Sequence, residues 1–117
     1  MKYTSYFSDK FKELITKKYA GIKKSAKNKI DIIINKPFFG ESLKGDLDGL
    51  RSAPVKGNFI IIYIICKECR EKEKDKLLNC SICSETLDES IIFIYLAPHD
   101  DAYKIAKKLV NKGKIFN

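Results

Sequence analysis

The chain has 117 residues, of which 44% are apolar and 32% are charged, and its formal net charge is +8. This length allows one domain, residues 1–117, and the apolar content excludes an intrinsically disordered chain. The positive charge favours RNA, DNA or an acidic protein as the binding partner.

The N-terminal part of the chain predicts one strand followed by two helices. Residues 2–7 alternate aromatic and polar side chains, which is typical of a short, half-buried strand, and Ser8 is placed to cap a helix. Gly21 is expected to separate the helix that begins at Asp9 from the helix that follows. Beyond it, apolar residues recur at three- and four-residue spacing in residues 22–34, with lysines on the other side, so we expect an amphipathic helix that ends before Pro37.

The middle and C-terminal parts predict three strands. Residues 38–48 are rich in glycine and indicate a loop. Residues 50–55 form the first of these three strands, at a sheet edge or a bulge because Pro54 has no N–H to donate. Residues 59–65 and 91–96 are almost entirely β-branched or aromatic, as in central strands that are buried on both faces.

The order of these elements predicts the fold class. A final helix is expected from about Asp100, which gives the order β-α-α-β-β-β-α. This order indicates an α+β domain with an antiparallel twisted sheet and helices packed on one face. The longest apolar run, residues 59–66, is shorter than the roughly 20 residues of a membrane span. We therefore expect a cytoplasmic protein with no membrane partner.

A charged insertion, residues 66–90, separates the last two predicted strands and contains all four cysteines. Cys66 and Cys69 form one Cys-x-x-Cys pair, and Cys80 and Cys83 form another ten residues later. This spacing is typical of a tetrahedral zinc site, and four thiolates leave no open coordination position, so we predict structural zinc. The alternatives are two disulfides or four reduced cysteines.

Two segments resemble the RelE/ParE toxins of type II toxin–antitoxin systems. Residues 43–52 read Leu-Lys-Gly-Asp-Leu-Asp-Gly-Leu-Arg-Ser, and after a turn residues 59–63 read Phe-Ile-Ile-Ile-Tyr, which is similar to the family's signature region. Residues 99–103, His-Asp-Asp-Ala-Tyr, resemble its C-terminal segment. With the order of elements, the resemblance covers nearly the whole chain except the cysteine insertion, and it implies a RelE/ParE toxin-like fold.

The likeness to the RelE branch implies an endoribonuclease that cleaves mRNA, typically on the ribosome, and that is inhibited by a cognate antitoxin protein. The implied reaction is attack of a ribose 2′-hydroxyl on the adjacent phosphate, which needs no metal or other cofactor. His99 is the only histidine and can transfer protons near neutral pH, and Tyr103 can orient or stack on the substrate. Arg51 is expected to clamp a phosphate. The expected substrate-binding residues are Lys44, Ser52 and Lys56.

The sequence also departs from the family pattern and leaves other functions open. Ile60 stands where the family commonly carries an arginine, and Asp100 stands where a basic residue often follows the histidine. Either the active site is rebuilt around His99 and Arg51, or the chain is a weak nuclease, or it inhibits DNA gyrase without cutting RNA, as the ParE branch does. The cysteines and the charge alone would fit a zinc-knuckle RNA-binding protein. His99 could instead cap the last helix, with Tyr103 in the core, and Arg51 could pair with an aspartate of the preceding loop.

Overall fold

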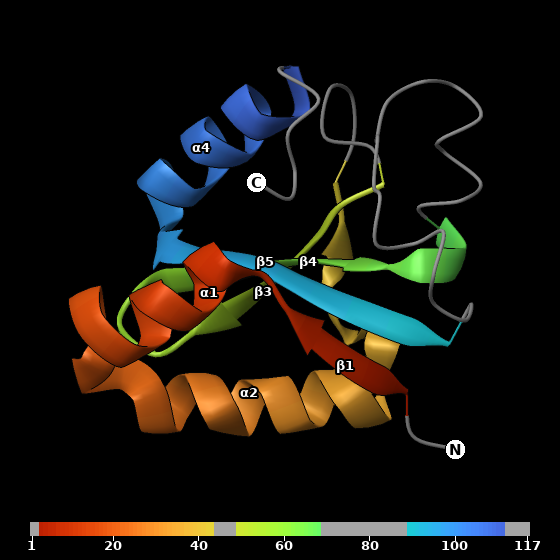
Figure 1. The fold of residues 1–117 in the computed structure, drawn as a ribbon, viewed down its shortest axis with the longest axis horizontal. Coiled ribbons are helices and arrows are strands. Elements are labelled where there is room, and N and C mark those ends of the chain that lie inside the picture. The colour runs from red at the N-terminus through yellow and green to blue at the C-terminus, as the bar shows by residue number, and fades with distance from the viewer. Residues whose placement is uncertain (1–2, 44–48, 69–88, 112–117) are drawn as a thin grey trace.

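The computed structural model describes residues 3–43, 49–68 and 89–111 of the chain (Figure 1). These residues form a five-stranded sheet with helices against it. The elements are, in chain order, β1 Thr4–Phe7, α1 Asp9–Glu13, a π-helical turn Leu14–Lys18, a 3-10 turn Ala20–Ile22, α2 Lys23–Asn35, a 3-10 turn Pro37–Phe39, β2 Glu41–Ser42, β3 Arg51–Val55, β4 Phe59–Ile65, β5 Ser90–Pro98 and α4 His99–Asn111.

The sheet has the strand order β1-β5-β4-β3-β2. The predicted α+β class and the predicted order of elements are confirmed, with β2 as an additional strand inside the segment expected to be a loop. The sheet is not wholly antiparallel, however, because β1 runs parallel to β5 while the other pairs are antiparallel. A parallel pair needs a long connection, and the chain between β1 and β5 is long enough to supply it.

Helices cover both faces of the sheet, so the expectation of helices on one face is wrong. Helices α1 and α2 pack on the face that holds Ile61 and Tyr63, which we call the α2 face. Helix α4 packs on the opposite face, which holds Ile60, Ile62 and Ile64 and which we call the α4 face (Figure 1). The physical reason is that β4 and β5 are apolar on both sides, and each side must be removed from water.

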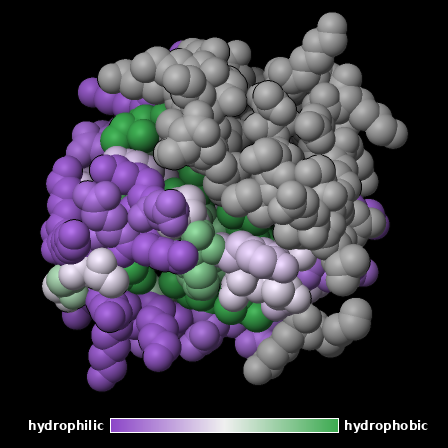
Figure 2. All heavy atoms as spheres, in the orientation of Figure 1, coloured by the Kyte–Doolittle hydropathy of each residue, from purple (hydrophilic) through white to green (hydrophobic). Residues whose placement is uncertain are grey.

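The outer sides of α1 and α2 are hydrophilic, as the lysine pattern predicted. Lys23, Lys24 and Lys27 are exposed, whereas Ala26 and Ile30 are buried against the sheet. Figure 2 shows hydrophilic side chains over α1 and α2, with hydrophobic side chains visible between them. Within the described part of the chain, no helix has the length and apolarity needed to cross a membrane.

Two local predictions, the helix cap at Ser8 and the edge position of Pro54, are confirmed. The Ser8 Oγ accepts a hydrogen bond of 3.0 Å from the Phe11 N–H at the start of α1 and donates one of 2.7 Å to the Ile94 carbonyl of β5. Strand β2 pairs with Arg51 and Ser52, so no described strand lies beside Pro54 on the side of β3 away from β4. The missing N–H of Pro54 therefore costs the sheet no hydrogen bond.

The segment from Pro37 to β2 is held against the sheet by a buried tyrosine. The Tyr63 hydroxyl accepts a hydrogen bond of 2.9 Å from the Gly40 N–H and donates one of 2.7 Å to the Pro37 carbonyl. Burial is the main cause of a pKa of Tyr63 above its ordinary value. A single side chain thus fixes the turn that leads into β2.

This hydroxyl predicts how stability depends on alkaline pH. Because the folded state raises the pKa of Tyr63, the stabilisation is complete below the ordinary tyrosine pKa of about 10 and is lost as pH rises through the raised value. Tyr63→Phe should cost about 1–3 kcal/mol near pH 8, because two buried backbone groups lose their partner. Urea unfolding should then show a smaller alkaline decline in the variant than in the wild type, and equal declines would contradict this role. The two proteins differ only at this hydroxyl, so the difference between their declines reports on Tyr63 alone.

Candidate functional site

Three of the predicted site residues meet on the α4 face. The His99 and Tyr103 rings, one turn apart on α4, make an edge-on contact with centroids 4.9 Å apart and an interplanar angle of 74°. The Tyr103 hydroxyl lies 3.1 Å from the Ser52 Oγ of β3, at hydrogen-bond distance with either group as the donor. The structure therefore joins two segments that lie 51 positions apart in the sequence.

The position of His99 is set by both its backbone and its side chain. Its N–H donates a hydrogen bond of 2.8 Å to the Asn58 carbonyl in the β3–β4 turn, and its side chain is 49% exposed. Its Nδ1 lies 3.2 Å from the Asp100 Oδ1. Because Nδ1 faces Asp100, Nε2 is the ring nitrogen left for proton transfer to or from a substrate.

Asp100 therefore has a different meaning from the one the sequence suggested. In the sequence, Asp100 stands where the family often has a basic residue. In the structure, its carboxylate lies within hydrogen-bond distance of the His99 imidazole. Asp100 and Asp101 also lie in the first turn of α4, where negative charge suits the helix dipole. Both groups of the His99–Asp100 pair are exposed, so the pair orients the ring more than it stabilises the fold.

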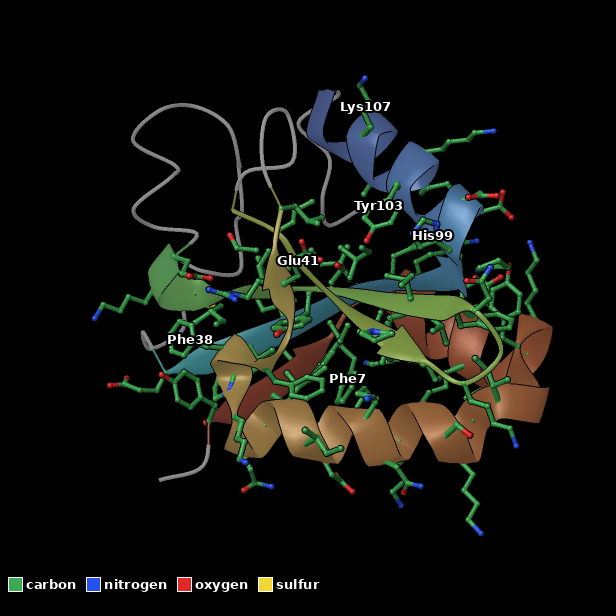
Figure 3. All side chains as sticks on the ribbon, turned by 180° about the vertical axis from the view of Figure 1, so that it is seen from behind. Phe7, Phe38, Glu41, His99, Tyr103 and Lys107 are labelled. Atoms are coloured by element: carbon green, nitrogen blue, oxygen red, sulfur yellow. The ribbon has the colours of Figure 1, made fainter. Side chains whose placement is uncertain are left out.

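Two further residues, Glu41 and Lys107, lie on this face and were not predicted from the sequence. Glu41 on β2 pairs directly with Ser52 on β3, so both side chains lie on the same face of the sheet. Figure 3 shows Glu41, Tyr103 and His99 on the side of the sheet that carries α4, with Lys107 one turn further along that helix. The four-residue spacing of His99, Tyr103 and Lys107 could have revealed the helical row. No pattern could have revealed Glu41, because a two-residue strand has no visible alternation.

Arg51, which the sequence grouped with His99 and Tyr103, lies apart from them on the other face of the sheet. Arg51 pairs with Tyr63 in the β3–β4 register and so lies on the α2 face. Its Nε and Nη2 donate to the two carboxylate oxygens of Glu68 at 2.8 and 2.9 Å, and its Nη1 donates to the Gly40 carbonyl at 2.8 Å. The hydrogen bond with Glu68 is the main cause of a raised Arg51 pKa. Arg51 thus forms an ion pair with Glu68, and the aspartates of the preceding loop, Asp46 and Asp48, lie outside the described residues.

The remaining predicted substrate-binding positions fall in different places. Lys44 lies outside the described residues. Lys56 is exposed in the β3–β4 turn, whose Asn58 carbonyl contacts the first residue of α4, so its positive charge lies near the start of that helix. Ile60 is buried in the core of the α4 face, and it offers no charge at the position where the family commonly has an arginine.

The predicted zinc site can be followed only at its first cysteine. Cys66 directly follows β4 and is fully buried in the core of the α4 face, while Cys69, Cys80 and Cys83 lie outside the described residues. Among the residues that the structure describes, no group of three or more histidine, cysteine or acidic residues could hold a metal ion. Structural zinc bound by the four cysteines stays a prediction.

We compared the chain with known proteins by sequence and by structure. By sequence, no family model and no curated protein matches. A solved chain of the toxin–antitoxin complex RelBE2 from Mycobacterium tuberculosis is similar, with a TM-score of 0.58, over 84% of this chain and 99% of that chain, at 15% sequence identity. This chain has a RelE/ParE toxin-like fold. The conserved hypothetical protein HP0894 from Helicobacter pylori is also similar, with a TM-score of 0.45 and 16% identity over 84% of this chain and 96% of that chain.

The predicted fold is therefore confirmed, although the two sequences are only 15% identical. This fold brings the two motifs into contact. The first motif leads into β3, which carries Ser52, and the second begins α4, which carries Tyr103. The hydrogen bond between these two side chains connects the motifs directly.

Proposed function

We propose that this chain is the toxin of a toxin–antitoxin pair and that its protein partner is a cognate antitoxin. The observation that carries the proposal is the fold, which this chain shares over most of its length with nearly all of a chain from the RelBE2 complex. The net charge of +8 supports a partner with acidic side chains.

The activity that fits the α4 face best is cleavage of mRNA without a metal cofactor, on the ribosome or free. In this reaction the ribose 2′-oxygen attacks the adjacent phosphorus, the bond from phosphorus to the 5′-oxygen breaks, and a 2′,3′-cyclic phosphate and a 5′-hydroxyl form. The Glu41 carboxylate accepts the proton of the 2′-hydroxyl. His99 donates a proton to the departing 5′-oxygen, after which both groups exchange protons with water.

The other residues of this face position the substrate. Tyr103, held by Ser52, offers a hydroxyl and a ring beside His99 for orienting or stacking on a nucleotide. Lys107 on the same row of α4 and Lys56 in the β3–β4 turn are exposed cations that can attract phosphate. These lysines take the part that the sequence assigned to Arg51.

A second candidate function is a toxin that inhibits a protein target such as DNA gyrase without cutting RNA. Two observations favour it. Ile60 is buried where the family commonly has an arginine, and Arg51 forms its ion pair with Glu68 on the opposite face from His99. Both reduce the positive charge available to stabilise a phosphorane.

The deciding experiment is expression in a bacterial host followed by primer extension on cellular messages. Growth should stop on induction and resume when the neighbouring reading frame is expressed as antitoxin. Discrete cleavage sites within mRNA support the endoribonuclease, and growth arrest with intact messages supports the second candidate. Normal growth at a verified level of folded protein would contradict both.

A further inference from the structure

Two neighbouring aromatic side chains are exposed at the sheet edge next to the proposed site. Phe38 and Phe39, in the 3-10 turn Pro37–Phe39, are 57% and 47% exposed, whereas the other phenylalanines of the described residues are buried or half-buried. Exposed phenylalanine rings give up the stability that burial would supply. Such rings indicate a surface that is covered when the protein works.

Each ring is backed by a cation. The Arg51 Cζ lies 4.9 Å from the centroid of the Phe38 ring, and the Lys29 Nζ lies 4.8 Å from that of the Phe39 ring. Each cation covers one face of its ring, and the measured exposure leaves the rest of each ring open to solvent. We call this pair of rings the Phe38–Phe39 platform.

The Phe38–Phe39 platform is held in place before any ligand binds. Arg51, beneath Phe38, is fixed by Glu68 and by the Gly40 carbonyl, and the backbone on either side of the two rings is held by Tyr63 through Pro37 and Gly40. A ligand that stacks on a ring fixed in this way loses little free energy to the ordering of side chains.

The platform continues the proposed site around the edge of the sheet. Phe38 lies only three positions before Glu41, the proposed proton acceptor, with Gly40 between them. In Figure 3, Phe38 lies beside the end of α2, and Glu41, Tyr103 and His99 lie toward α4. An extended polymer that crosses β2, the edge strand, can contact both groups of residues.

We propose that the Phe38–Phe39 platform stacks unpaired bases of the single-stranded RNA whose backbone enters the α4 face, an inference that rests on the proposed endoribonuclease. Base stacking needs only one or two open aromatic rings with cations nearby, which is what this surface offers. A specific protein interface needs a much larger apolar area than these two rings offer. The lysine-rich composition also suits a polyanion better than an apolar partner.

The test is direct binding of a short, fluorescently labelled, single-stranded 2′-O-methyl RNA, which has no free 2′-hydroxyl and cannot be cleaved. Phe38→Leu and Phe39→Leu should each weaken binding by about tenfold, as expected for the loss of one stacked base. The matched control is Tyr6→Leu, which removes a 38% exposed ring from β1 at the opposite edge of the sheet and should leave the affinity unchanged.

A fluorescent variant reports on stacking itself. The chain contains no tryptophan, so Phe38→Trp places a single indole at the platform. RNA should quench its emission, whereas Tyr6→Trp should show no quenching. Unchanged affinity in both leucine variants, or an indole that RNA does not quench, would overturn the platform.

The remaining outcomes separate the platform from the proposed function. Leucine variants that bind RNA normally but are no longer neutralised by the antitoxin would assign the rings to a protein contact and overturn the proposal. Cleavage by leucine variants that bind RNA as tightly as the wild type would overturn the platform and keep the endoribonuclease. A wild-type chain that binds no RNA and leaves messages intact would overturn both.

Discussion

Replacing His99 by alanine or Glu41 by glutamine is expected to lower the proposed RNA cleavage by about a hundredfold or more, because each change removes one of the two proposed proton transfers. Glutamine keeps the size of the glutamate side chain but cannot accept the 2′-hydroxyl proton. Both residues are exposed, so neither change should alter the midpoint of urea unfolding by more than a small amount.

Cleavage of a defined single-stranded RNA by the purified variants, with and without ribosomes, measures this loss. Tyr103→Phe separates positioning from proton transfer, since it keeps the ring contact with His99 and removes the hydrogen bond to Ser52. We expect it to retain more activity than the alanine variant at His99. Wild-type cleavage by both the His99 and the Glu41 variants would remove these residues from the site.

The elements with strong local patterns were predictable from the sequence. Strands β4 and β5 are runs of isoleucine and aromatic residues, α2 has a clear apolar stripe, and Ser8 caps α1 as its side chain suggests. Each of these features depends on neighbours within one or two turns or on simple burial. The same apolar runs require that both faces of the sheet be covered, as they are in the structure. The prediction of helices on one face did not take this requirement into account.

The composition of the site was harder to predict because it depends on faces and register. Arg51 and Ser52 are adjacent in a strand, so their side chains point to opposite faces of the sheet and cannot meet in one cluster. Only the structure decides that Ser52 meets Tyr103 and that Arg51 meets Glu68, 17 positions away. Glu41 reaches the site through a pairing of two residues, which leaves no periodic signal.

One turn connects the stability of the fold to the placement of the site. Gly40 directly precedes Glu41, donates to the Tyr63 hydroxyl and accepts from Arg51. It therefore lies between the buried core of the α2 face and the strand that carries the proposed proton acceptor. A change that moves Gly40 should affect both unfolding and cleavage.

Gly40→Ala is accordingly expected to destabilise the chain by about 2–3 kcal/mol, an effect of overpacking and not of backbone strain. A Cβ at this position would lie 2.5 Å from the Tyr63 hydroxyl, 2.7 Å from the Ser52 carbonyl oxygen and 2.8 Å from the Tyr63 Cε1. Tyr63 is fully buried and Ser52 is paired on both sides in the sheet, so neither can move away at low cost.

Urea unfolding of Gly40→Ala beside Gly21→Ala measures this effect with a matched control. A Cβ at Gly21 meets nothing within 4 Å, so the same substitution there should change the free energy of unfolding by less than about 0.5 kcal/mol. At a temperature where Gly40→Ala remains folded, its cleavage should also fall, because the shift of the turn displaces Glu41 from the register with Ser52. Equal unfolding midpoints for the two alanine variants would mean that the turn can relax, and that Tyr63 does not fix the position of β2.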